Sequence, residues 1–415
     1  MFKYKCSALA AAVAALGLCL CLGVAVAQQS PASAPATETA KTAEAAAPAV
    51  AAADAPKQSK LAAAIAKAPR GTGAGQIDDS KPLGFLGIPG APTVNPILAF
   101  CWAVWVGWIF STVGAFGGVM AGVGHMSIFG LGSFAGPLKK TVPELGRIIT
   151  DSIKISNQFM GGLSAAISSF NYLKMGRLVL PLAISLGLGS LIGAWGAQEL
   201  SAGKLDFKSY QGYFGLFVLL LGFWLFYETT PAGQAKKQTA SKAARAFEDA
   251  VKKQKCGETV EECNLGMHVQ KFTLSTCEFT FCGVPFRFKP LLPFIGGVLI
   301  SAVAAFLGVG GGFLLVPFLT SVTQLPMYLA AGTSAMAVLI SMITSIITLM
   351  SKGTSVEWSL IGIELTGVAV GSIVGPMTSR YFSDVLMKRI FIVLSFYIGV
   401  GYLLAGFFGI KIPGV

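Results

Sequence analysis

Charged side chains are scarce in this sequence of 415 residues. Asp, Glu, Lys and Arg together make up 12% of the chain, whereas 54% of the residues are hydrophobic. A soluble domain usually carries about 25% charged residues. This shortage of charge excludes an ordinary globular enzyme and indicates a polytopic membrane protein built from helical spans.

Histidine is also rare, with two in the chain, and several functional motifs are missing. No GxxxxGK[ST] loop occurs, so the chain itself should not hydrolyse ATP. There is no CxxC pair and no cofactor motif, so we expect no enzyme activity, no cofactor and no metal. The net charge of +12 comes from residues in loops beside apolar segments, where they set topology and contact lipid headgroups. No nucleic-acid partner is expected.

The N-terminal region has the features of an exported protein. Lys3 and Lys5 precede an apolar run, which ends at the small residues Ala25 and Ala27. We predict a signal peptide over 1–27, with an uncleaved anchor helix as the alternative. Residues 28–95 are rich in Ala, Pro, Ser and Thr, and we predict a disordered extracytoplasmic segment.

Apolar segments long enough to cross a bilayer recur through the rest of the chain. The expected spans cover 96–119, 155–173, 178–197, 210–227, 291–307, 329–350, 358–377 and 386–408. They divide into a first membrane repeat (96–227), a cysteine-containing polar loop (228–290) and a second membrane repeat (291–415). The sequence therefore predicts an all-α polytopic membrane protein with about eight transmembrane helices in two homologous halves with glycine-rich helix breaks.

The two halves can be aligned by their small residues. Gly189-Ser190-Leu191-Ile192-Gly193 matches Gly371-Ser372-Ile373-Val374-Gly375, Ser156-Asn157 falls on Thr333-Ser334, and Gly122-Val123-Gly124 falls on Gly308-Val309-Gly310. The halves differ where His125 and Met126 replace Gly311 and Gly312. Repeated halves place the binding site of a transporter at their interface, near the membrane midplane.

Basic residues in short loops favour an orientation. With eight spans and an extracytoplasmic N-terminus, loop 139–154 lies inside and the polar loop 228–290 lies outside. If each glycine-rich break instead adds a crossing, each half has five spans, the repeats are inverted and the polar loop is cytoplasmic. We favour eight spans.

The most unusual stretch of the chain is Gly308-Val309-Gly310-Gly311-Gly312-Phe313-Leu314-Leu315-Val316-Pro317. Glycine and proline disfavour an ordinary helix, yet the flanking residues are apolar. Broken backbone at membrane depth survives where protein buries it or a wet cavity hydrates it. The stretch predicts either an anion site at a half-helix N-terminus or a close packing face between helices.

This stretch, with Ala331-Gly332-Thr333-Ser334, resembles the signature of the TauE/SafE family of sulfite exporters. The resemblance covers about residues 96 to 410. It implies a multi-pass permease of the bacterial cytoplasmic (inner) membrane that exports sulfite or a related sulfur-containing anion. Its partners would be that anion and membrane lipid; a homo-oligomer is left open.

Candidate substrate-binding residues are small or neutral, because an oxyanion needs hydrogen-bond donors without competing negative charge. They are Gly308, Gly310, Gly311, Gly312, Thr333, Ser334, Gly122, Gly124, Ser156, Asn157 and Gln158. The hydroxyl and amide side chains could equally form hydrogen bonds between helices. Asn157 and Gln158 are adjacent, so at least one of them should be structural.

Two ionisable residues are candidates for proton coupling. His125 lies beside the first break and titrates near physiological pH, although it could simply be a neutral hydrogen-bonding group. Glu364 lies inside a span, where a carboxylate is costly and indicates function; the alternative is a protonated group bonded to a neighbouring helix.

The polar loop carries four cysteines, Cys256, Cys263, Cys277 and Cys282. Outside the cytoplasm they should form two disulfides of undetermined connectivity. Inside, thiols or zinc would be favoured, although the spacing differs from that of zinc ribbons. A membrane redox or sensory protein using this loop is the alternative to a secondary transporter.

Overall fold

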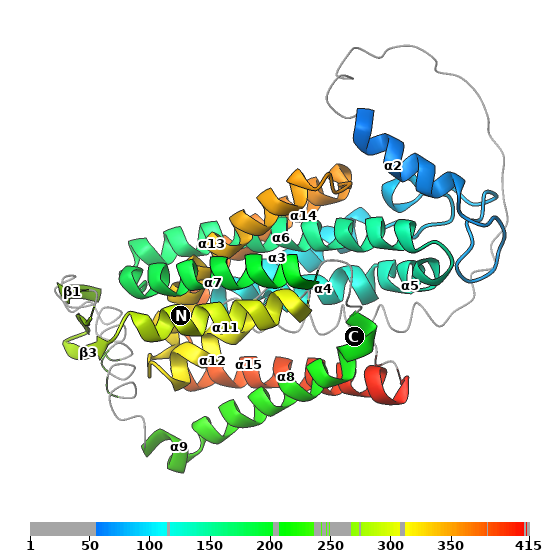
Figure 1. The fold of residues 1–415 in the computed structure, drawn as a ribbon. Coiled ribbons are helices and arrows are strands. Elements are labelled where there is room, and N and C mark those ends of the chain that lie inside the picture. Colours follow the sequence, from blue (N-terminus) through cyan, green and yellow to red (C-terminus); the bar gives the residue numbers. More distant parts are fainter. Residues whose placement is uncertain are drawn as a thin grey trace.

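The computed structural model describes residues 55–113, 117–201, 207–235, 267–273, 275–307, 312–379, 381–410 and 412, with positions 242, 246 and 249. Long helices lie side by side in a bundle (Figure 1). The segment that precedes the bundle and a small β-sheet lie at its opposite ends. The predicted signal peptide, residues 28–54 of the predicted disordered segment, and Cys256 and Cys263 fall outside the described residues.

Each of the eight expected spans overlaps a long helix of the bundle, although 96–119 also reaches α4 (Gly117–Val123) and 386–408 continues into η4 (Leu404–Phe408). The long helices are α3 (Pro96–Val113), α6 (Pro143–Lys174), α7 (Leu180–Ser201), α8 (Phe207–Thr229), α11 (Leu291–Leu307), α13 (Met327–Ser351), α14 (Trp358–Ser379) and α15 (Asp384–Leu403). By length and composition, four helices among the described residues can cross a membrane, or five if one bent pair counts as a span. The chain is therefore a multi-pass membrane protein.

The bent pair lies between α3 and α6. Helix α4 (Gly117–Val123) continues into the π-helix η2 (Gly124–Ile128), and α5 (Leu131–Thr141) follows at an angle of 71°. Gly130 forms the corner with a φ of +73°, a conformation that glycine adopts without strain. In the second part of the chain, the short helix α12 (Gly312–Ser321) occupies the corresponding place after α11 and packs against α4.

Helix α14 runs parallel to α3 in close contact. A β-carbon at Gly367 would crowd the α3 backbone at Phe100 and Val104, whereas one at Gly375 would crowd Ser111 and Thr112. The numbering rises along both helices, so they point the same way. The absence of side chains at these positions lets the two backbones approach closely.

Helix α14 also runs parallel to α6. Ser372 contacts Ser164, and further along both helices Ser379 approaches Tyr172. Because α3 and α6 are both parallel to α14, the chain has to return to its starting end between them. Segment α4–η2–α5 makes this return, although the basic residues of α5 had been assigned to a loop in the eight-span interpretation.

The helices α7 and α11 repeat this arrangement. Gly189 and Gly193 of α7 approach the backbone of Phe294 and Val298 in α11, so the two helices are parallel. Helix α13 packs against α6 and α7, and α15 packs against α8. Gly176 and Gly353 follow α6 and α13 with φ values of +64° and +76°, as glycines that terminate helices do.

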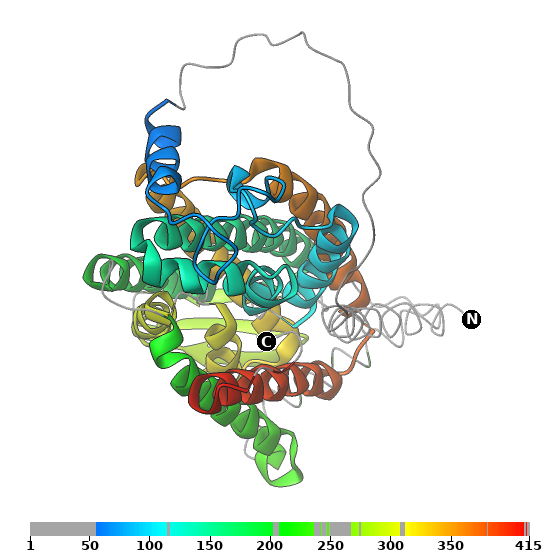
Figure 2. The same cartoon turned by 90° about the vertical axis from the view of Figure 1, so that its right-hand side faces the viewer.

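The segment before α3 is ordered from residue 55 onward, contrary to the disorder predicted for 28–95. It contains α2 (Ala55–Ala66) and the 3-10 helix η1 (Phe85–Gly87). Ile77, Phe85 and Ile88 are buried, and they supply the apolar contacts that the composition had seemed to lack. The backbone N–H of Leu86 donates to Glu357 beside the start of α14, so this segment covers that end of the bundle (Figure 2).

The polar loop contains a β-sheet, so the prediction of an entirely α-helical chain was wrong there. Antiparallel strands β1 (Met267–Phe272), β2 (Cys277–Phe281) and β3 (Val284–Phe288) follow one another in order. The hairpin between β2 and β3 turns at Cys282 and Gly283, both with positive φ, as a two-residue hairpin requires. The N–H of Met267 donates to the carbonyl of Gly176, which joins the sheet to the α6–α7 corner.

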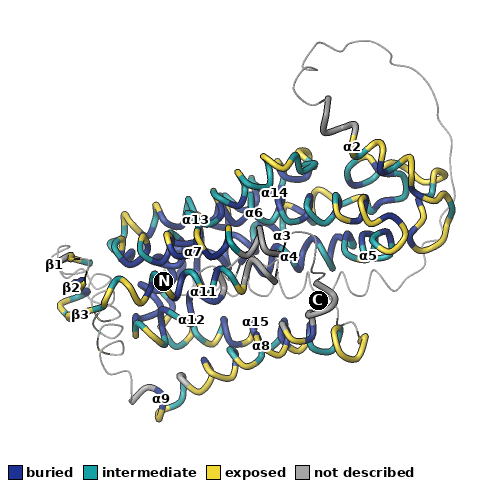
Figure 3. The backbone as a smooth tube through the Cα atoms, in the orientation of Figure 1, coloured by how far each residue is buried: buried dark blue, intermediate teal, exposed yellow. Residues whose placement is uncertain are grey.

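Buried residues concentrate where α3, α6, α13 and α14 meet, and exposed ones on the outer face of α8 (Figure 3). The exposed side chains of α8 include Phe217, Leu220, Phe223 and Trp224. Exposed apolar and aromatic side chains on a membrane helix face lipid. Helices α9 (Pro231–Ala235) and η4 (Leu404–Phe408) extend the ends of α8 and α15.

Candidate functional site

The π-helix places His125 inside the bundle. A π-turn leaves α-helical carbonyls without their usual partner, and the indole N–H of Trp102 donates to the carbonyl of Met120 at 3.2 Å. A β-carbon at Gly124 would overlap the Trp102 ring, so this glycine is needed for packing. Single π-turns within helices are frequent at functional sites, and here the turn carries the only described histidine within the bundle.

His125 and Glu364 form a fully buried pair. The Nε2 atom of His125 lies 3.0 Å from Oε1 of Glu364, and both side chains are 0% exposed. His125 lies in the π-helix η2, next to the bend, whereas Glu364 lies in the continuous helix α14. The sequence singled out each of them for proton coupling; the structure brings them together.

The second ring nitrogen of His125 determines how many protons the pair holds. Nδ1 lies 3.1 Å from the carbonyl oxygen of Ala121. A carbonyl only accepts, so Nδ1 carries a hydrogen. Nε2 then has to share a further proton with Glu364, as imidazolium beside carboxylate or as imidazole beside carboxylic acid. Without that proton, lone pairs of the two groups would face each other at 3.0 Å.

The pair is poorly satisfied by its surroundings. Apart from their mutual contact at 3.0 Å, Nε2 of His125 and the carboxylate oxygens of Glu364 have no hydrogen-bond partner among the described residues. Buried polar groups without partners are rare and call for a functional explanation. This geometry is suited to a group that exchanges a proton or a ligand.

Two amide side chains follow one another on α6, and the first of them, Asn157, lies near this pair. The amide nitrogen of Asn157 is 3.7 Å from where a β-carbon at Gly122 would lie, so Gly122 leaves room beside Asn157. The amide oxygens of Asn157 and Gln158 have no hydrogen-bond partner among the described residues. Ser156 instead donates to the carbonyl of Ser152 within α6, which makes it a structural hydroxyl.

A line of hydroxyl groups continues from this pair along the contact between α6 and α14. The hydroxyls of Ser164 and Ser372 lie 2.7 Å apart. One turn further along α6, Ser168 is fully buried and its hydroxyl has no partner among the described residues. After another turn, the Tyr172 hydroxyl lies 3.4 Å from that of Ser379. We refer to Ser164, Ser168, Tyr172, Ser372 and Ser379 as the polar seam.

The polar seam ends at Arg177, which is 1% exposed. Its Nη1 lies 3.5 Å from the Ser379 hydroxyl, and its guanidinium stacks over the rings of Tyr172 and Tyr328, at 4.8 Å and 5.2 Å. The Tyr172 hydroxyl also donates to the carbonyl of Ser111 at the end of α3. A charged side chain is therefore held inside the bundle by aromatic faces and hydroxyls.

The predicted substrate residues of α13 lie at this end, away from His125. Thr333 accepts a hydrogen bond from the N–H of Val179 at 3.2 Å, and Ser334 donates to the carbonyl of Ala331. Gly332 packs against Tyr172 and the carbonyl of Arg177. The hydroxyl of Thr333 thus bonds to a neighbouring segment, whereas that of Ser334 bonds within its own helix.

Most of the second glycine-rich break lies outside the described residues. Gly308, Gly310 and Gly311 lie outside the described residues, and Gly312 is the first residue of α12. Pro317 lies within α12 and does not end it. The anion site predicted at these glycines therefore stays a prediction.

Two of the four loop cysteines, Cys277 and Cys282, lie among the described residues. Cys277 is buried in β2, and no disulfide joins it to Cys282 in the adjacent turn. Burial raises the pKa of Cys277, and it raises the pKa of Cys282 to about 11. Since Cys256 and Cys263 lie outside the described residues, the predicted disulfides are untested there.

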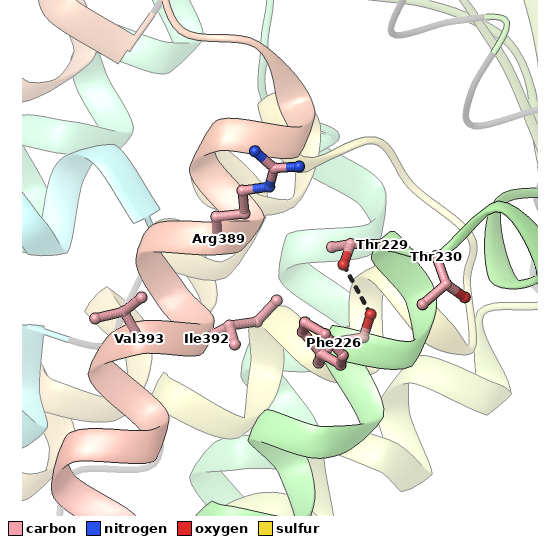
Figure 4. A pocket seen from close by; sticks show the side chains of 6 residues that line it. All are labelled: Phe226, Thr229, Thr230, Arg389, Ile392 and Val393. Atoms are coloured by element: carbon pink, nitrogen blue, oxygen red, sulfur yellow. Dashed lines mark hydrogen bonds between the residues drawn. The ribbon is translucent and has the colours of Figure 1, made fainter.

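A cavity of about 470 Å³ lies elsewhere, between the end of α8 and the start of α15 (Figure 4). It is lined by Phe226, Thr229, Thr230, Arg389, Ile392 and Val393. The side chains of Phe226 and Val393 are more than half exposed, at 55% and 61%. The cavity therefore opens on the lipid-facing surface, and we assign the functional site to the buried polar groups instead.

Sequence reasoning missed the polar seam and Arg177. The signal for the seam was present, because Ser164, Ser168 and Tyr172 follow one another at intervals of four residues and so share a helix face. Arg177 lies between two apolar segments, and nothing in its neighbouring residues indicates burial. No group of three or more potential metal ligands occurs among the residues that the structure describes.

Comparison with protein families agrees with a membrane protein built from long apolar helices. A family model described as sulfite exporter TauE/SafE matches residues 99–402, from α3 to α15. Neither the curated proteins nor the solved structures give a match. The family model covers well over half of the sequence. The chain is thus a member of the TauE/SafE family of membrane transporters.

Proposed function

We propose that this protein is a secondary transporter that exports sulfite or a related sulfur-containing anion across the bacterial inner membrane, and that His125 and Glu364 couple this export to a proton. The buried His125–Glu364 contact of 3.0 Å carries the proposal. The candidate anion-binding groups are the glycines from Gly308 to Gly312, with Gly122 and Asn157 near the buried pair and Gln158 next to Asn157 in α6.

The proton balance of the pair suggests how coupling works. In the geometry described, the pair holds one proton between Nε2 and Oε1. Loss of that proton sets a carboxylate oxygen against the Nε2 lone pair, and in a low-dielectric interior this repulsion is strong. Since His125 lies on a π-turn and Glu364 on a continuous helix, we expect proton loss to move η2 away from α14.

The directions of the helices support a change of topology from the one favoured by the sequence. With α3 and α6 parallel, α4–η2–α5 is a crossing, and α12 takes the matching place in the second half. We propose five membrane segments in each half, in inverted orientations. The loop that contains β1–β3 then lies on the side opposite to residues 55–95. If the N-terminus is exported, the loop is cytoplasmic, where thiols persist.

The alternative function, a redox or sensory protein using the loop cysteines, has less support. The reactive form of cysteine is the thiolate. Burial raises the pKa of both Cys277 and Cys282, which disfavours that form at neutral pH. In addition, Cys277 is fully buried, so a partner protein or substrate would not reach it.

The test is transport of labelled sulfite in proteoliposomes with an imposed pH gradient. The variants are Glu364→Gln and His125→Gln, and the matched control is Glu144→Gln, the same change at an exposed carboxylate of α6. We expect wild type and the control to move sulfite with the gradient. Both variants should lose gradient-driven transport, while Glu364→Gln retains counterflow exchange, which needs no net proton movement.

Two results would count against the proposal. If well-expressed wild-type protein moves no sulfite and no other sulfur oxyanion, the assigned substrate class is wrong. If Glu364→Gln is driven by the pH gradient as well as wild type, anion transport stands but the buried pair does not couple it to protons.

A further inference from the structure

The cavity between α8 and α15 has no part in the proposed coupling of anion and proton. Its volume of about 470 Å³ falls within the range of about 300–1,000 Å³ that is common for small-ligand sites. The two helices that form it are antiparallel, because a β-carbon at Gly215 would crowd the backbone of Gly399 and one at Gly222 would meet Ser395. The end of α8 therefore lies beside the start of α15, with the cavity between them (Figure 4).

This cavity lies close to one end of the bundle. Helix α9, which follows α8 directly, is at the same end as the β-sheet (Figure 1). Trp224 and Tyr227, in the last turns of α8, are both exposed. Exposed tryptophan and tyrosine side chains on membrane helices gather at headgroup depth. The cavity is thus at the level where lipid headgroups meet the protein.

Polar and apolar lining residues are separated within the cavity. Arg389, Thr229 and Thr230 lie toward the end of the bundle (Figure 4). Phe226 and Ile392 lie about one helical turn further from that end, because α8 ends here and α15 begins here. A ligand that matches this arrangement has a polar head at the membrane surface and an apolar tail directed toward the membrane interior.

Among the lining residues, Arg389 carries the charge. Its side chain is exposed, and within the described part of the chain no hydrogen bond or ion pair engages it. The two threonine hydroxyls are not equivalent donors, because Thr229 donates to the carbonyl of Phe226 at 2.7 Å and Thr230 donates to that of Tyr227 at 2.6 Å. A guanidinium forms its strongest hydrogen bonds with phosphate and carboxylate groups. The head of the ligand should therefore be anionic.

We propose that the cavity between α8 and α15 binds an anionic phospholipid, with its phosphate on Arg389 and an acyl chain along Phe226, Ile392 and Val393. A free phosphate would match Arg389 but not the apolar inner end. The exposed side chains of Phe226 and Val393 leave the cavity open to the bilayer, so a lipid can enter from the side. Basic pockets between membrane helices bind anionic headgroups in this way. The proposal does not depend on which anion the protein exports.

The test measures lipid binding to the full-length protein in a neutral maltoside detergent. Phosphatidylglycerol, phosphatidylcholine with the same acyl chains, and glycerol 3-phosphate are titrated separately. The melting temperature is recorded, and native mass spectrometry counts the lipids that remain bound. The variants are Arg389→Gln and Val393→Asn. The matched control is Lys174→Gln, which removes an exposed cation at the end of α6, on the sheet side of the bundle.

We expect phosphatidylglycerol to raise the melting temperature of wild type and Lys174→Gln more than phosphatidylcholine does. Arg389→Gln should lose about fivefold in apparent affinity for phosphatidylglycerol and keep its affinity for phosphatidylcholine. Val393→Asn should weaken the binding of both lipids, because an amide replaces an apolar contact of the acyl chain. Glycerol 3-phosphate should have little effect, because it lacks acyl chains.

Three results would overturn the proposal. The first is equal stabilisation of wild type by phosphatidylglycerol and phosphatidylcholine. The second is equal affinity of folded Arg389→Gln and wild type for phosphatidylglycerol; if Arg389→Gln does not fold, unchanged lipid affinity of Val393→Asn takes its place. The third is glycerol 3-phosphate stabilising wild type, but not Arg389→Gln, as strongly as phosphatidylglycerol does, which would identify a site for a free phosphate instead.

Discussion

The close contact between α3 and α14 predicts a large penalty for the smallest possible side chain. A β-carbon at Gly371 would lie 2.7 Å from the backbone nitrogen of Trp108 and would overlap the carbonyl oxygen of Val104. Carbon atoms make favourable contacts at about 3.5 Å or more, so the Trp108 contact alone requires the helices to separate by about 0.8 Å. The obstructing atoms are backbone, which a rotamer change cannot move.

The size of the effect of Gly371→Ala follows from two opposing terms. Overpacking of this kind costs about 1–3 kcal/mol, and a backbone collision belongs to the upper part of that range. Alanine is the better helix former by about 1 kcal/mol. We therefore expect a net loss of about 1–2 kcal/mol. Gly362→Ala in the same helix is the matched control, because a β-carbon there meets nothing within 4 Å.

The measurement is the thermal unfolding of detergent-purified protein, followed by fluorescence-detected size exclusion. Gly371→Ala should lower the melting temperature by about 2–5 °C. Gly362→Ala should leave it unchanged or raise it. Equal melting temperatures for the two variants would refute the inference that α3 and α14 touch backbone to backbone.

Three further predictions follow from the seam, the loop and the glycine-rich break. A double-mutant cycle of Ser164→Ala and Ser372→Ala should give a coupling free energy of about 0.6 kcal/mol; additive losses would contradict the 2.7 Å contact. Burial raises the pKa of Cys282 to about 11, so the alkylation of Cys282 should be slow at pH 7. Its rate should rise about tenfold for each pH unit until the pH reaches this pKa; an alkylation rate that does not change with pH would contradict this burial. Gly311→Leu should abolish sulfite transport at normal expression, unlike Gly196→Leu at an open helix position; normal transport by Gly311→Leu would rule out the backbone anion site.

The positions of the long helices could be predicted because apolar length is a strong signal. Each expected span overlaps a long helix, with boundary errors that are largest for α6, which begins at Pro143. Its first turns carry Glu144, Arg147 and Asp151, so hydropathy alone places them outside a span. The ordered segment before α3 was missed for the opposite reason: Ile77, Phe85 and Ile88 are too few to register in its composition.

The site was predicted in its parts but not in its assembly. His125 and Glu364 stand out because ionisable residues inside membrane segments are rare. Their contact depends on α14 returning parallel to α3 and on the 71° corner after η2, and neither feature is encoded in local hydropathy. The sheet could have been found, because Cys277 to Phe281 alternates apolar and polar residues, as a strand does.

The glycine contacts also constrain how this transporter can move. Helices α3 and α14 meet backbone to backbone, and so do α7 and α11. Each pair joins one helix from before the sheet to one from after it, so the two parts of the chain are cross-braced. Sliding along such a contact would drive carbonyl groups into each other. We therefore expect each helix pair to move as one rigid body during transport. The conformational change should be confined to the short helices η2 and α12.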